Sequence, residues 1–179
     1  ILREDPAFFA TRESSQEPHF LWIGCSDSRV PAETVTGALP GEMFVHRNIA
    51  NQVHGADLCV QSVIAYAVDV LAVRQILVTG HTACGGVAAA TAEPRHGMVD
   101  HWLGSVRMLW LRHREELGTL PSKEAGLDRL AQWAGEVGVP QQRLAADQGR
   151  VAGEAGDDGD RAALLGVHAM GPEGVAPFI

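Results

Sequence analysis

The sequence lacks any apolar stretch long enough to span a bilayer, because Asp, Arg or Gly interrupts each strongly apolar run. It also lacks a positively charged and then apolar leader, so we expect a cytoplasmic protein. Basic residues are few: 14 Lys and Arg stand against 22 Asp and Glu, which gives a formal net charge of −8. This balance disfavours binding to nucleic acid or to anionic membranes.

Cysteine is scarce as well. The three cysteines, Cys25, Cys59 and Cys84, are an odd number, which fits disulfide pairing poorly. In a reducing compartment two of them would be free to act as thiolate ligands. None lies in a C-x-x-C spacing, so a dithiol redox site is not expected. Cys59 has no partner motif, and we interpret it as a core residue.

The secondary structure predicted from periodicity alternates between strands and helices. Short apolar runs that end at turn residues indicate buried strands, and apolar groups at helical spacing indicate helices. The predicted strands are 20–23, 43–45, 75–79 and 164–168, and the predicted helices are 5–10, 57–73, 87–92, 98–117 and 124–134. Residues 135–160 should be mostly loop or mobile helix. We therefore expect a single α/β domain over 1–179, with a mostly parallel central sheet flanked by helices.

Two short segments carry the residues with chemical potential. Residues 25–29 read Cys-Ser-Asp-Ser-Arg after the first predicted strand, and residues 81–86 read His-Thr-Ala-Cys-Gly-Gly after the third. Because the carboxyl ends of parallel strands share one edge, both segments can converge there. Two thiolates, one imidazole and one carboxylate or water make a tetrahedral site, and sulfur ligands favour zinc over magnesium, calcium or manganese. Taken singly, each Cys or His is more typical of ordinary packing.

The same segments resemble a known family. The run LWIGCSDSRVP over 21–31 closely resembles the first signature of bacterial β-class carbonic anhydrases. The run PGEMFVHRNIAN over 40–51 is similar to the block that follows, and TGHTACGG over 79–86 is similar to the second signature. The likeness extends from about Asp5 to Leu117, whereas 118–179 match the family poorly. Such motifs in order and in register are very specific.

The resemblance implies reversible hydration of carbon dioxide to bicarbonate and a proton by zinc-bound hydroxide. One Zn²⁺ per chain would be held by Cys25, His81 and Cys84, with water or Asp27 in the fourth position. Zinc lowers the pKa of bound water from about 15.7 to about 7. Asp27 and Arg29 would form a catalytic dyad: held by Arg29, Asp27 orients the hydroxide, and once released it occupies the metal and blocks catalysis.

A substrate pocket is also implied by the resemblance. Gln16 matches a glutamine that hydrogen-bonds bicarbonate. Phe44, Ile49 and Tyr66 match an apolar wall, which suits a small nonpolar gas. Gly85 begins a helix whose backbone N–H groups favour anions. Taken singly, each of the three apolar residues is more typical of plain core.

Some bacterial members bind bicarbonate at a second, inhibitory site, and Trp22, Gly24 and Arg47 match its residues. We hypothesise that this chain belongs to that regulated subtype. The tyrosine partner of that site is missing, because residues 167–172 read VHAMGP and Tyr66 is the only tyrosine. Packing of Trp22 in the core and an ion pair of Arg47 explain these residues equally well.

The resemblance finally implies a homodimer or tetramer, with carbon dioxide and bicarbonate as ligands and neither nucleic acid nor membrane as partner. Three alternatives stay open. A related hydrolase of COS or CS2 would keep the same ligands. A catalytically silent zinc-binding homologue would serve as a regulatory or assembly subunit, and a purely structural zinc domain would have no activity at all. The presence of Asp27 and Arg29 argues against the last two.

Overall fold

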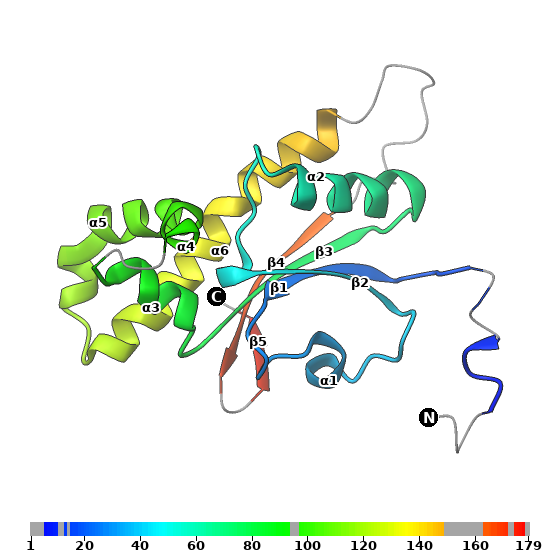
Figure 1. Ribbon diagram of the computed structural model, residues 1–179, viewed down its shortest axis with the longest axis horizontal. Coiled ribbons are helices and arrows are strands. Elements are labelled where there is room, and N and C mark those ends of the chain that lie inside the picture. The colour runs from blue at the N-terminus through cyan, green and yellow to red at the C-terminus, as the bar shows by residue number, and fades with distance from the viewer. Residues whose placement is uncertain are drawn as a thin grey trace.

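The chain is built around one central sheet. A computed structural model describes residues 6–10, 13, 15–93, 97–148, 163–171 and 174–177. The sheet has five strands in the order β2-β1-β3-β4-β5: β1 (Phe20–Cys25), β2 (Met43–Asn48), β3 (Gln75–His81), β4 (Ala163–Gly171) and β5 (Gly174–Pro177). The first four strands in the chain are parallel, and β5 is antiparallel at one edge (Figure 1). The predicted mostly parallel α/β fold is confirmed.

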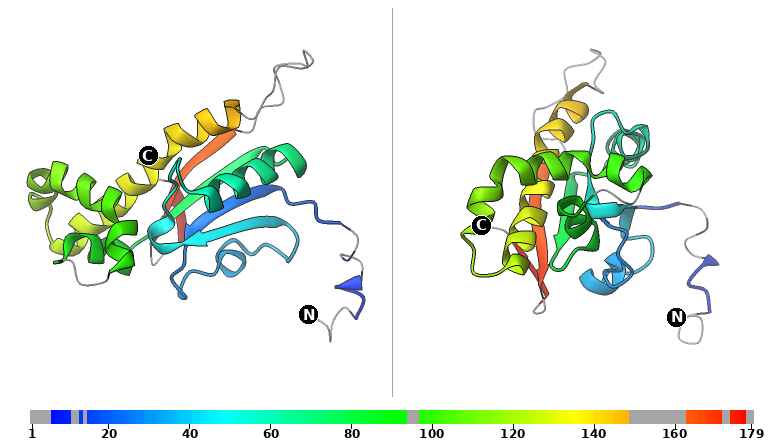
Figure 2. Two further views of the ribbon diagram at one scale, coloured as in Figure 1. Left: turned by 45° about the horizontal axis from the view of Figure 1, so that its top comes forward. Right: turned by 60° about the vertical axis from the view of Figure 1, so that its left-hand side comes forward.

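Helices cover both faces of this sheet. They are α1 (Ala32–Thr36), α2 (Leu58–Ala65), α3 (Gly85–Thr91), α4 (Met98–Trp102), α5 (Gly104–Gly118) and α6 (Lys123–Gln148), with a 3-10 helix η2 (Ile49–Asn51) and a π-helical turn η3 (Tyr66–Val70). α1 and α2 lie on opposite faces, whereas α3, α4 and α5 gather beyond one end of the sheet (Figures 1 and 2). The carboxyl end of β3 leads into α3 of this group, whereas β1 leads into α1.

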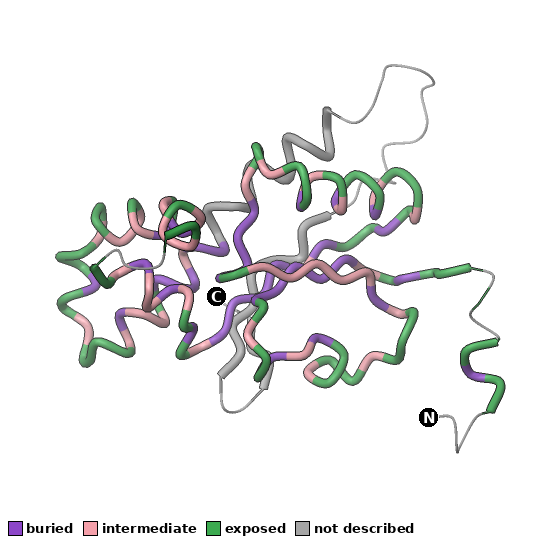
Figure 3. The backbone as a smooth tube through the Cα atoms, viewed as in Figure 1, coloured by how far each residue is buried: buried purple, intermediate pink, exposed green. Residues whose placement is uncertain are grey.

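The sequence of β1 explains why it is the central buried strand. Leu21 and Ile23 pack toward α2, while Trp22 between them packs against Ala32 of α1. All three strand residues are almost completely buried, which Figure 3 shows along the middle of the sheet. An unbroken apolar run is typical of a parallel strand that is covered on both faces.

Most predicted elements are present, with two corrections outside the helical group. The predicted helix 57–73 is α2 continued by η3, and the predicted strand 164–168 lies within β4. Residues 6–10 form turns rather than the expected short helix. Cys59 is exposed rather than part of the core, because it lies in the first turn of α2 on the face opposite Val60 and Ile64, which are buried.

The region after 134 needs a further correction. Of the two forms expected there, loop or mobile helix, the structure shows helix as far as Gln148, because α6 continues through Gly135 and Pro140. Its first half is fixed by packing, since Leu130, Ala131 and Ala134 are buried against α3 and α5. Tertiary packing of this kind outweighs the low helix propensity of Gly126 and Gly135, which are both buried. Residues 149–160 of the expected loop lie outside the described residues.

The helices also show whether one of them could span a membrane. Among the residues with described positions, no helix combines the length and the apolar character that a membrane span requires.

Candidate metal centre

The three predicted ligands meet at the carboxyl ends of β1 and β3. Cys25 is the last residue of β1, His81 is the last residue of β3, and Cys84 is the N-cap of α3. The two sulfur atoms are 3.9 Å apart, and the ligating atoms of all three residues lie within 4.8 Å of one another. All three residues are buried. In the described part of the chain, no other group of His, Cys, Asp or Glu side chains is gathered in this way.

The donor set fits zinc. His81 Nδ1 lies 2.9 Å from the carbonyl oxygen of Thr82, so this nitrogen carries the hydrogen and Nε2 presents a lone pair. His81 Nε2 is buried and has no hydrogen-bond partner, a costly situation unless a metal ion binds there. Two sulfurs and one imidazole nitrogen are the ligands that zinc prefers.

The surroundings of the two thiols shift their pKa values in opposite directions. The hydrogen bond from Cys84 lowers the pKa of Cys25, and His81 together with the backbone of Asp27 and Ala50 lowers it further against the effect of burial. The same bond raises the pKa of Cys84, as does its burial. These shifts favour a thiolate at Cys25, the form that a soft metal ion binds.

Asp27 lies beside this cluster and is held away from it. Its Oδ2 is 3.8 Å from His81 Nε2, yet Asp27 is not one of the residues whose ligating atoms gather within 4.8 Å. Arg29 donates from Nε to Oδ1 over 2.9 Å and from Nη2 to Oδ2 over 2.7 Å. These hydrogen bonds hold the pKa of Asp27 well below its usual range and raise the pKa of Arg29. The carboxylate is therefore ionised and turned toward Arg29.

The residues matched to a regulatory site have other contacts. Arg47 donates from Nε to the carbonyl of Cys25 over 2.8 Å and from Nη2 to the carbonyl of Asp27 over 2.6 Å. Its guanidinium therefore holds the backbone of the loop that carries the dyad. Trp22 is buried, and its indole packs so closely over Gly24 that a Cβ there would overlap Trp22 Nε1. These contacts are those of a core tryptophan and a loop-fixing arginine; the regulatory role stays a prediction.

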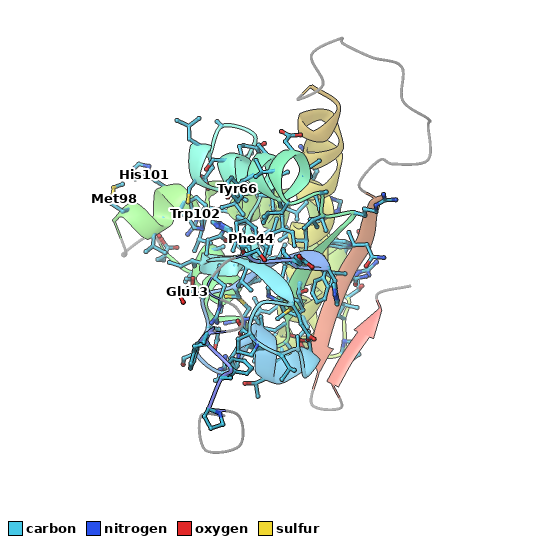
Figure 4. All side chains as sticks on the ribbon, turned by 90° about the vertical axis from the view of Figure 1, so that its right-hand side faces the viewer. Glu13, Phe44, Tyr66, Met98, His101 and Trp102 are labelled. Atoms are coloured by element: carbon cyan, nitrogen blue, oxygen red, sulfur yellow. The ribbon has the colours of Figure 1, made fainter. Side chains whose placement is uncertain are left out.

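The predicted pocket residues divide into two groups. Ile49 lies near the ligands, because a Cβ on Gly86, the residue next to Gly85, would be 2.8 Å from Ile49 Cγ2. Phe44 and Tyr66 stack on each other, with ring centroids 5.8 Å apart (Figure 4). Phe44 pairs with Leu21, whereas Cys25 pairs with Asn48.

The Cα of Phe44 is therefore roughly 13 Å from the level of Cys25 along the strands. Gln16 is exposed and precedes β1, so it too lies toward the amino end of that strand. Within one chain the structure does not bring Gln16, Phe44 or Tyr66 to the metal ligands.

One residue with a role at this centre was not predicted. Asp128 of α6 accepts a hydrogen bond of 2.9 Å from the backbone N–H of Ala83, which lies between the ligands His81 and Cys84. Asp128 belongs to no motif and is far from both signature segments in the sequence. Only the packing of α6 against β3 reveals it.

Comparisons with known proteins agree with this geometry. The family model described as carbonic anhydrase matches residues 20–141. The β-carbonic anhydrase CafA of Aspergillus fumigatus has the same fold, with a TM-score of 0.84 and 36% identity over 99% of this chain and 83% of that one. The chain belongs to the β-class carbonic anhydrase family. One of two tetrameric β-carbonic anhydrases solved from Sordaria macrospora is 38% identical, with a TM-score of 0.77 over 94% of this chain and 82% of its own.

One relative is much longer than the segment that it shares with this chain. The carbonic anhydrase of Emericella nidulans is 45% identical over 128 residues, which are 72% of this chain and 56% of the relative. The match thus spans little more than half the length of that relative.

Proposed function

We propose that this β-carbonic anhydrase family member catalyses the reversible hydration of carbon dioxide to bicarbonate and a proton. The observation that carries the proposal is the pairing of two features at one strand edge. Cys25, His81 and Cys84 form a buried cluster suited to one zinc ion. Beside it, 3.8 Å from His81 Nε2, lies the carboxylate of Asp27, kept ionised by Arg29. A purely structural zinc site has no need of that second feature.

The protein's own groups would divide the work as follows. Cys25, His81 and Cys84 would hold the zinc ion. When bound, zinc supplies Lewis acidity, which in catalytic sites brings the pKa of a water ligand to about 7. The two sulfur ligands place negative charge at the centre, so we expect the hydration rate to rise toward basic pH.

Asp27 would orient the reacting water. An ionised carboxylate can only accept hydrogen bonds, so Asp27 Oδ2 is the atom that would hold the hydrogen of that water. Arg29 would prevent Asp27 from turning toward the metal ligands, since both carboxylate oxygens accept from its guanidinium. The proton released by hydration would then pass to solvent or buffer.

We also propose self-association, which the description of the Sordaria structures as tetrameric supports. Gln16 and Tyr66 are exposed, Phe44 is partly exposed, and all three lie away from the metal ligands of their own chain. As pocket residues they would have to serve the centre of a neighbouring chain. The cytoplasmic location expected from the sequence stays a prediction.

Stopped-flow measurement of CO2 hydration on the zinc-loaded protein tests the proposal. We expect faster hydration at pH 8.5 than at pH 7, and a loss of about 10²-fold in Asp27→Ala, the size typical of a lost proton acceptor. Asp69→Ala, which removes an exposed carboxylate from η3, is the matched control. Absence of hydration with one zinc bound per chain would favour the silent homologue. Turnover of COS or CS2 instead would favour the related hydrolase.

A further inference from the structure

We propose that Asp128 on α6 is a positioning residue of the Asp27–Arg29 dyad and acts through the backbone of Ala83. The inference rests on the proposed function and extends it to a helix that the family signatures do not reach. It starts from Ala83, which stands between two metal ligands and has an unusual backbone conformation. Its φ angle is +52°, in the left-handed region that alanine rarely adopts.

Both polar groups of Ala83 are held from outside its own loop. Its N–H donates to Asp128 Oδ1 over 2.9 Å. Its carbonyl oxygen accepts from Arg29 Nη2 over 3.1 Å. A backbone conformation of this kind persists where the surroundings fix it, and such positions are common at functional sites. Here the fixing groups are a carboxylate on α6 and the guanidinium of the dyad.

These contacts form a continuous path from α6 to Asp27. Arg29 Nη2 donates both to Ala83 O and to Asp27 Oδ2, the latter over 2.7 Å. The side chain of Arg29 is 63% exposed, so little packing restrains it apart from these two acceptors. The carbonyl of Ala83 is therefore the one acceptor outside Asp27 that the described part of the structure gives for fixing the position of this guanidinium. If Asp128 no longer accepted the N–H of Ala83, the left-handed conformation of Ala83 would lose a restraint. The Ala83–Cys84 peptide, which carries the carbonyl, could then reorient, and Arg29 would lose its second anchor.

Asp128 does not reach the dyad itself. It lines a cavity of about 310 Å³ together with His81, Thr82 and Gln132, and its recorded hydrogen bond is the one to Ala83. The hydrogen-bonded route from Asp128 to Asp27 runs through Ala83 and Arg29. If Asp128 acts by this route, its effect on catalysis requires Arg29, whereas a general contribution to stability does not.

The experiment compares Asp128→Ala with Asp128→Asn, because an asparagine amide oxygen can still accept the N–H of Ala83. Glu124→Ala removes a carboxylate from the exposed first turn of the same helix and is the matched control. We expect Asp128→Ala to lower kcat at least about tenfold, since small misplacements of catalytic groups have effects of this size. KM and zinc content should stay unchanged. Asp128→Asn and Glu124→Ala should resemble the parent.

A double-mutant cycle tests whether the effect passes through Arg29. In an Arg29→Ala background, Asp128→Ala should cause no further loss of kcat. Equal losses in both backgrounds would overturn the proposal and assign Asp128 a general structural role. Unchanged kcat in Asp128→Ala, with faster hydrogen exchange at the Ala83 amide, would overturn it as well.

The same variants separate this inference from the proposed function. If the zinc-loaded parent shows no hydration, the proposed function fails, and the NMR signal of Arg29 Nε–H becomes the readout. Its loss in Asp128→Ala and retention in Asp128→Asn would still support the positioning role. Its persistence in Asp128→Ala would overturn that role.

Discussion

Arg29 donates three hydrogen bonds to the carboxylate of Asp27. The backbone N–H and Nε of Arg29 reach Oδ1 over 3.0 and 2.9 Å, and Nη2 reaches Oδ2 over 2.7 Å. Two parallel bonds between a guanidinium and a carboxylate fix geometry as well as charge. While they persist, Asp27 stays ionised and cannot turn to the metal ligands. Under the proposed function, the state of this pair would decide whether Asp27 can take the fourth position on a bound metal ion.

Arg29→Lys tests the importance of the paired geometry. Lysine keeps the positive charge but lacks the planar fork, so Asp27 should be held less firmly and hydration should fall by about tenfold or more. Zinc content should be unchanged. Arg112→Lys, at an exposed position of α5, controls for the substitution itself. Hydration equal to that of the parent would show that charge alone is sufficient.

Zinc should stabilise the fold through its ligands. A ligand that binds only the folded state at a concentration 1,000 times its Kd adds about 4 kcal/mol of stability. We expect the Tm of the parent to fall when a chelator removes zinc, and Cys84→Ser to lose most of that response. Cys59→Ser, at the exposed third cysteine, should keep it. A chelator response in Cys84→Ser as large as that of the parent would remove Cys84 from the ligand set.

Two adjacent glycines of α3 should differ sharply. A Cβ on Gly86 would lie 2.8 Å from Ile49 Cγ2 and 3.2 Å from Ala50 Cβ, whereas a Cβ on Gly85 would meet nothing within 4 Å. Overpacking of this kind typically costs about 1–3 kcal/mol, so Gly86→Ala should lower the free energy of unfolding by that amount. Gly85→Ala should leave it nearly unchanged. Equal effects of the two substitutions in denaturant unfolding would contradict the close approach of α3 to η2.

His46 should make the fold sensitive to mild acid. Asn48 Nδ2 donates to the carbonyl of Gln52 and its Oδ1 accepts the N–H of Gln52, so the orientation of its amide is fixed. His46 Nε2, 3.2 Å from Asn48 Nδ2, must therefore accept, which requires a neutral ring. Burial also lowers the pKa of His46, against a weaker opposing effect of Asp57.

The sign of this effect follows from proton uptake. Because the folded-state pKa is lower than that of the unfolded chain, the unfolded state binds more protons as the pH falls below about 6.5. The contribution of His46 to stability is therefore complete above that pH and is lost on acidification. In His46→Gln, the decrease in stability between pH 7.5 and pH 5.5 should be smaller than in the parent. His101→Gln, an exposed histidine, is the control; identical pH dependence in parent and His46→Gln would refute the assignment.

The metal centre could be predicted because its determinants are local. Cys25 and His81 each end a short apolar strand, and parallel strands bring their carboxyl ends together. Burial of β1 on both faces followed equally from its unbroken apolar sequence. The convergence of the two segments and the preference for zinc followed from strand order and donor chemistry, whereas the assignment of Cys25, His81 and Cys84 as ligands came from the family resemblance.

The long-range contacts could not be predicted in this way. Asp128 lies 45 positions from Ala83 in the sequence. After residue 134 the sequence left loop and helix open, and it did not show that α6 continues without a break to Gln148. The place of Phe44 depends on the register of β2 against β1, and that of Tyr66 on its stacking against Phe44. The family motifs specify neither contact. In each case the missing information was how one element packs on another.

The most direct test of the central claim is to titrate zinc into metal-free protein and follow CO2 hydration at pH 8.5 in the same samples. The account predicts that hydration rises in proportion to zinc, reaches its maximum at one zinc per chain and stays absent in His81→Ala at the same zinc concentration. Stoichiometric zinc binding without hydration would contradict it.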